Sequence, residues 1–270
     1  MAQPAPIPTA NLGQEIPAHA RERLATMRQK RFFTSDLSVN EFLLVKEAGF
    51  QPLGLVMGSS IYSISAQHLA TAQPGEVVPL TQSLYQSREL AMERMEAEAD
   101  ELGADGIVAM RLTVAVHAWG TNIIEFLAIG TAVRHLDGQG AFRTPAGKPF
   151  TSDLSGQDFW TMLNAGYRPL GFVMGNCVFY VGPPAQASAQ NGELPGPTQA
   201  LYDSRELAME RMQAEAEGLN AEGIVGVTVD ETNHTWGPTV LEFSAVGTAV
   251  VPIRADHTIP RPTLVLPVTG

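Results

Sequence analysis

The chain repeats itself once, at a constant offset of 117 positions. The segment FTSDLS begins at Phe33 and again at Phe150, and SRELAMERM begins at Ser87 and again at Ser204. About half of the positions from 33 to 133 are identical to their partners, with no gap between the copies. Self-similarity at a fixed offset identifies a repeated structural unit. The sequence is therefore a tandem duplication, and residues common to both copies serve the shared fold or a shared site.

The duplication divides the 270 residues into five parts. We expect an N-terminal extension over 1–32, a first unit over 33–135, a linker over 136–149, a second unit over 150–252 and a C-terminal tail over 253–270. Each unit lies near the lower end of the range of about 100–200 residues that is typical of a domain.

Each unit begins with the signature of a short helix. Ser38 precedes Glu41 by three positions, and Ser155 precedes Asp158 in the same way. A serine followed three residues later by an acidic side chain is the pattern of a capping box, for which the shorter aspartate is a weaker match. Glycine commonly ends helices because it accepts the left-handed conformation. We expect the two short helices to end at Gly49 and Gly166.

The rest of each unit predicts a strand, a long helix and two further strands. The apolar, β-branched and glycine-containing run after Pro52 is typical of a buried strand. Apolar side chains at intervals of three, four and seven predict amphipathic helices over 81–102 and 198–219. The following apolar runs, joined at a Trp-Gly turn, predict two paired strands. The predicted fold class is α+β: two copies of a β-α-β-β unit, each preceded by a short extra helix.

Such a unit is thin. A sheet of about three strands with one helix on one face buries little core and leaves strand edges open. We therefore expect the units to associate.

The order and spacing of these segments resemble one known family. From Ala200 to Val250, and again from Ser83 to Val133, the sequence is similar to the YbjQ-like family, whose label is heavy-metal binding. The resemblance implies a dodecin-like fold and a ring-shaped homo-oligomer, commonly a pentamer of single units. Two copies in one chain could stack as two rings in a five-chain assembly or alternate around one ring. Because a ring of five units cannot be built from two strictly alternating copies, we expect the stacked arrangement.

Composition and charge exclude several classes of protein. The net charge is −11 and the pI is near 5.0, which argues against nucleic acid as the general partner. No uncharged apolar run approaches the roughly 18–20 residues of a membrane span. The N-terminus lacks the basic and apolar regions of a secretory signal. The single cysteine, Cys177, suits a reducing compartment. We expect a bacterial-type protein of the cytoplasm.

A duplicated metal site has four candidate ligands. His117 and His234 precede the Trp-Gly turns, and Glu125 and Glu242 lie across the predicted hairpins. Histidine and carboxylate groups are common metal ligands. Cys177 has Ser60 as its counterpart, so it cannot belong to a duplicated thiolate site. Ordinary hydrogen bonding at a hairpin rim is the alternative role of these histidines.

Two aromatic residues and one polar set are also duplicated. Trp119 and Trp236 could stack on a flat aromatic cofactor, or pack against a neighbouring subunit. A Tyr–Arg–Glu cluster on the long helix could act as acid, electrophile and base, but its commoner role is salt bridging between subunits. We assign it to an interface and identify no catalytic residue. The cluster comprises Tyr85, Arg88, Glu89, Tyr202, Arg205 and Glu206.

The two extensions differ in character. Residues 18–31 form a predicted basic helix, either solvated or lying on an acidic face of a neighbour. The tail IPRPTLVLPVTG has the apolar, proline-bracketed character of a segment that adds a strand to a partner, or of a disordered tail.

These observations predict a non-enzymatic, ring-forming homo-oligomeric protein for assembly or binding. Metal storage or resistance is the alternative, and binding of a flat cofactor is a further one.

Overall fold

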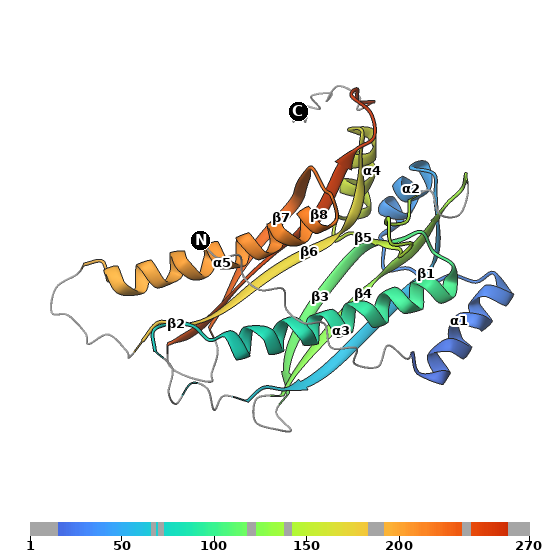
Figure 1. The fold of residues 1–270 in the computed structure, drawn as a ribbon. Helices are drawn as coiled ribbons and strands as arrows, with labels where there is room; N and C mark the ends of the chain where they lie inside the picture. Colours follow the sequence, from blue (N-terminus) through green and yellow to red (C-terminus); the bar gives the residue numbers. More distant parts are fainter. Residues whose placement is uncertain are drawn as a thin grey trace, which may run out of the picture.

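The computed structural model describes residues 16–65, 69, 73–117, 123–137, 142–182, 192–233 and 239–258 (Figure 1). A helix, α1 (Ala18–Lys30), precedes the repeats. The first repeat contains α2 (Val39–Glu47), β1 (Phe50–Ser63), β2 (Gly75–Glu76), α3 (Val78–Leu102), β3 (Gly106–His117) and β4 (Ile123–His135). The second contains β5 (Phe150–Thr151), α4 (Gly156–Asn164), β6 (Tyr167–Tyr180), α5 (Pro195–Gly218), β7 (Gly223–Asn233) and β8 (Val240–Pro252).

The predicted α+β class and its duplication are confirmed. In α2 the Ser38 side chain accepts from the Glu41 backbone N–H, and the Glu41 carboxylate accepts from Ser38 in return. In α4 the Ser155 side chain caps the helix through the Asp158 N–H. Both long helices begin three residues earlier than expected, because a proline in the first turn costs no hydrogen bond there.

The strands form two four-stranded sheets, and each sheet contains one strand from the other repeat. The first sheet has the order β1-β4-β3-β5 and the second has the order β2-β6-β8-β7. Strand β5, from the second repeat, pairs in parallel with β3 of the first. Strand β2, from the first repeat, pairs antiparallel with β6 of the second. The expectation of about three strands per sheet therefore missed this exchange of short edge strands.

Within one chain, the two repeats complete each other's sheets and lie side by side. This arrangement favours alternation of the two repeats around one ring over the expected stacking of two rings, and the arrangement of an assembly stays a prediction.

The hydrophobic core joins the repeats. One cluster consists mainly of first-repeat residues but includes Val178 and Val240 from the second. Another brings Phe50 and Val108 of the first repeat against Phe159 of the second. Rings at this end pack edge to face, with the Phe50 and Phe159 centroids 5.2 Å apart. Neither repeat buries its apolar surface alone.

The N-terminal helix α1 lies on its own chain. Arg23 forms an ion pair of 2.8 Å with Glu98 on α3, and Arg28 donates to the Glu101 carbonyl. Figure 1 shows α1 beside the C-terminal part of α3. The acidic face expected on a neighbouring subunit is thus provided by α3. Within the described residues, no helix is both long enough and apolar enough to cross a membrane.

Close packing of each long helix on its sheet requires a glycine, Gly58 in β1 and Gly175 in β6. We predict that Gly58→Ala destabilises the protein by about 3 kcal/mol, because the added methyl group would overlap the α3 backbone at Ala91. Urea unfolding followed by circular dichroism measures the loss. Gly196→Ala is the matched control, since its methyl group would meet no atom within 4 Å. Equal stability of the two variants would contradict the prediction.

Candidate functional site

The junction between the repeats is built on backbone pairing at two edges. At the first edge, Glu76 faces Phe179 across the β2–β6 pair. The Val77 N–H then donates to the Val178 carbonyl at 2.8 Å, and the Val178 N–H donates to the Thr81 hydroxyl at 2.9 Å. At the second edge, the Ser152 N–H donates to the Ile107 carbonyl at 2.9 Å. Hydrogen bonds at both edges fix the register of one repeat against the other.

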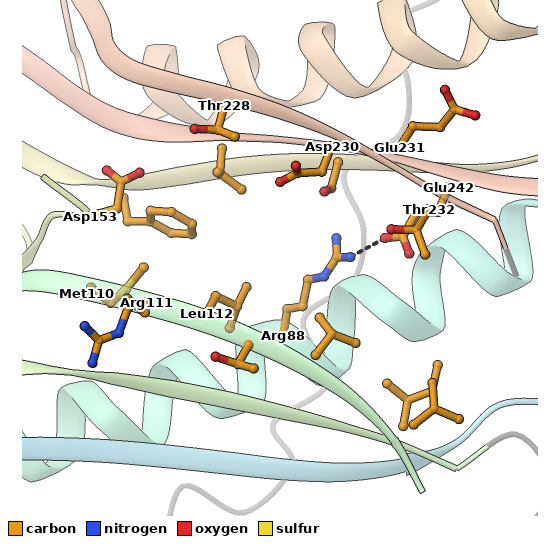
Figure 2. Close-up of a pocket in the computed structure, with 17 residues that line it drawn as sticks. Arg88, Met110, Arg111, Leu112, Asp153, Thr228, Asp230, Glu231, Thr232 and Glu242 are labelled. Carbon is orange, nitrogen blue, oxygen red and sulfur yellow. Dashed lines mark hydrogen bonds and ion pairs between the residues drawn. The ribbon is translucent and has the colours of Figure 1, made fainter.

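A buried ion pair crosses the junction. The Arg88 guanidinium, on α3, donates to the Glu242 carboxylate on β8, and both side chains are only 6% exposed. Figure 2 shows Arg88 reaching from the first repeat toward Glu242 in the second. The guanidinium also lies over the Phe126 ring, 5.4 Å from its centroid. A charge pair buried to this extent requires both partners, because either one alone would be an unpaired charge in a desolvated site.

A second ion pair closes the β2 edge. Arg211, on α5, contacts both carboxylate oxygens of Glu76 at 2.8 and 3.0 Å. The same guanidinium donates to the Asn176 carbonyl at 2.7 Å. This two-point contact attaches the loop before α3 to the second repeat.

A cavity of about 790 Å³ opens beside the Arg88–Glu242 pair. Figure 2 shows it between strands of the two repeats. Its volume falls in the range of about 300–1,000 Å³ typical of ligand pockets. Within the described residues, the Arg88 Nε atom is buried without a hydrogen-bond partner. The charged residues of the lining are Arg88, Arg111, Asp153, Asp230, Glu231 and Glu242.

A smaller acidic cleft lies between α3 and the second repeat. Burial raises the pKa of Glu89 to about 7, and nearby Glu96 and Glu93 act in the same direction, while Lys148 opposes it. Burial also raises the pKa of Glu215, on α5, to about 7. Lys148 pairs with Glu96 at 3.5 Å. Lys148 thus interacts with more than one carboxyl group at this cleft.

The six interface residues predicted from the sequence occupy two different environments. In the first repeat Arg88 is buried in the junction, and Tyr85 and Glu89 are half-buried. In the second repeat the Arg205 side chain contacts its own helix, at Glu206 (2.7 Å) and over the Tyr202 ring (4.7 Å). Arg88 is therefore buried, whereas its equivalent Arg205 is exposed.

The structure describes only some of the residues predicted to bind a metal or a cofactor. Glu242 is held by Arg88, and Glu125 lies half-buried on β4. The side chain of His117, and the whole of His234, Trp119 and Trp236, lie outside the described residues. Among the side chains that the structure describes, no group of three or more His, Cys, Asp and Glu could hold a metal ion. Cys177 is fully buried, and burial raises the pKa of its thiol to about 12.

Sequence reasoning missed the backbone edges and the Arg211–Glu76 pair. A signal for them existed, because Thr81, Glu76 and Arg211 all have identical counterparts 117 positions away. Their role could not be predicted, because each contact joins one copy to the other and no local sequence pattern indicates it.

The fold and junction define a class of protein: a tandem α+β repeat whose units associate side by side. Within that class the chain belongs to the YbjQ family, described as "Putative heavy-metal-binding", which matches residues 44–135 and 185–252.

Relatives occur with one unit and with a similar two-unit length. The encapsulin nanocompartment protein Rv1762c of Mycobacterium tuberculosis is 47% identical over 253 residues, covering 92% of this chain and 95% of that protein. A UPF0145 protein of Halorubrum lacusprofundi is 36% identical over 104 residues, which is 37% of this chain but 97% of that protein. A single unit can thus account for almost a whole relative.

The buried pair generates a stability prediction. We expect Arg88→Met to lower the free energy of unfolding by about 3–5 kcal/mol, because Glu242 would remain buried without its partner. The double variant R88M/E242M should recover most of this loss, since it removes both charges. Urea unfolding checks both. The equivalent exposed change, Arg205→Met, should cost less than about 0.5 kcal/mol when measured on dilute monomer. A similar cost at the two positions would contradict the prediction.

The acidic cleft generates a pH prediction. Because the pKa values of Glu89 and Glu215 are raised in the folded state, the folded chain binds more protons than the unfolded chain between about pH 4.5 and 7. Their contribution to stability is therefore present at low pH and is lost as the pH rises through about 7. The variant E89Q/E215Q should show a flatter pH dependence and exceed the wild type in stability at alkaline pH. Parallel unfolding profiles for the two proteins would contradict this.

Proposed function

We propose that the chain is a non-enzymatic assembly protein that forms a homo-oligomeric ring from its repeats. One observation carries the proposal: each repeat completes a sheet of the other at a junction that uses different surfaces on the two sides. A junction of this kind can continue from chain to chain, and closes into a ring if the rotation per unit permits.

The arithmetic of two repeats limits the ring. Whole chains contribute repeats in pairs, so a side-by-side ring contains an even number of them. Five chains would place ten repeats in the ring, and a ring of five repeats would leave one repeat outside. The single-unit relatives have no such restriction.

The name of the relative from M. tuberculosis supports a proposal about where the assembly is located. That protein is named as an encapsulin nanocompartment protein and matches the chain over nearly its full length. We propose that this chain likewise belongs to a cytoplasmic nanocompartment. We propose that the apolar C-terminal tail, of which residues 259–270 lie outside the described part, contacts a protein partner there.

Metal binding is the second candidate function, favoured by the description of the family. It would use His117 and His234 with Glu125 and Glu242. The ion pair from Arg88 stands against it, because a metal at Glu242 would have to displace a buried guanidinium.

Native mass spectrometry tests both functions in one measurement. We expect particles whose masses are multiples of the 28.9 kDa chain. A clean monomer at low micromolar concentration would overturn the assembly function. Additional mass from a metal, lost in H117A/H234A, would favour the second candidate.

A further inference from the structure

The junction between the two repeats has two sides, one on each repeat. We call the β2 segment, α3 and the outer edge of β3 the donor surface of the first repeat. The acceptor surface of the second repeat consists of β5, β6 and β8. The duplication places an equivalent donor surface on the second repeat, at residues 192–194, α5 and β7, and an equivalent acceptor surface on the first, at residues 33–37, β1 and β4. In the described part of the chain, neither the outer edge of β1 nor the outer edge of β7 pairs with a strand of the other repeat.

The donor surface of the second repeat exposes apolar side chains that its counterpart buries. Val225 is 37% exposed, whereas its equivalent Val108 is fully buried under β5. Leu194 is 48% exposed, whereas its equivalent Val77 is 5% exposed in the junction. Apolar side chains at equivalent positions are thus buried in the first repeat and exposed in the second.

The acceptor surface of the first repeat shows the same contrast. Phe33 is 44% exposed, whereas Phe150 is fully buried. Ile61 is 53% exposed, whereas Val178 belongs to the core of the first repeat. Large exposed apolar side chains beside an unpaired strand edge are typical of an interaction site.

The polar residues of the junction occur a second time in the sequence. Thr81 and Glu76, which serve the internal edge, correspond to Thr198 and Glu193. Arg94 lies in the pose of its equivalent Arg211, since it donates to the Ser59 carbonyl at 2.5 Å as Arg211 donates to Asn176. The pair equivalent to Arg88–Glu242 is Arg205 with Glu125.

We infer that a second copy of this chain docks head to tail on these surfaces, and that Arg205 pairs there with Glu125 of the partner subunit. This inference rests on the proposed assembly function and specifies its interface. The 192–194 segment adds to the β1 edge of the next chain, and the 33–37 segment of that chain covers the β7 edge. The partner is this chain itself, because the chain already contains the complementary surface of each side.

Disulfide crosslinking tests the register. In a Cys177→Ser background, Tyr62→Cys with Glu193→Cys places thiols at the interchain equivalents of Phe179 and Glu76, which face each other within the chain. Residues directly opposite on antiparallel strands lie about 4.5–5.5 Å apart, within reach of a disulfide. Mild oxidation should give covalent dimers and longer ladders that reductant removes.

Two controls make the crosslinking decisive. Glu76→Cys with Phe179→Cys should crosslink within one chain, and a mixture of the two single variants Y62C and E193C should stop at covalent dimers. If the internal control forms its bond and the interchain pair does not, the proposed interface is wrong. If native mass spectrometry still finds oligomers in that case, the assembly function stands with another interface; a monomer would overturn both.

A charge exchange tests the ion pair. Arg205→Glu and Glu125→Arg should each weaken chain–chain association by at least about 30-fold, measured by analytical ultracentrifugation. The double variant R205E/E125R should restore association, because the opposite charges face each other again with their positions exchanged. Unchanged thermal unfolding of dilute R205E would show that its fold is intact. Association that is insensitive to all three variants would overturn the assignment of the pair.

Discussion

Exchange of edge strands between the two repeats is the constraint on which the rest of the structure depends. A β-α-β-β unit has a helix over one face of a small sheet, and its outer strands carry unpaired backbone groups. In this chain β2 completes the second sheet and β5 completes the first. The cost of exposing those groups is thereby removed at two of the four edges, and the apolar clusters extend across the junction. The same logic applies to the two edges that remain, at β1 and β7.

The electrostatics of the junction follow from this packing. Arg88 and Glu242 are desolvated because α3 lies against β6 and the Arg88 side chain reaches β8 inside the junction, so their attraction must offset a large loss of hydration. Such a pair contributes specificity more reliably than stability, since a misaligned register would leave both charges unpaired. Arg205, which is chemically identical but exposed, contacts Glu206 and Tyr202 on its own helix. Burial, and not residue type, separates the two environments.

The fold could be read from the sequence to a large extent, because its signals are local. Capping at Ser38 and the glycines that end the short helices are patterns within a few residues, and the 117-residue offset doubled the evidence for each. The junction could not be predicted in the same way. The contact of Glu76 with Arg211 spans 135 positions, and nothing in either segment identifies its partner. The duplication predicts that two surfaces are alike, but it does not predict which surface of one repeat packs against which surface of the other.

Part of the divergence between the copies lies in β3 and β7. Strands β3 and β7 both begin with Gly-Ile-Val. Their second halves differ, because that of β3 is mainly apolar and that of β7 is mainly polar; for example, Glu231 stands at the position equivalent to Val114. Both strands line the internal cavity, β3 from the donor side and β7 from the sheet that accepts it. A chain of single identical units would repeat one cavity at every junction. In the proposed assembly, fusion of two units would allow alternate junctions to carry different linings on one backbone. The Arg–Glu positions stay the same in both copies.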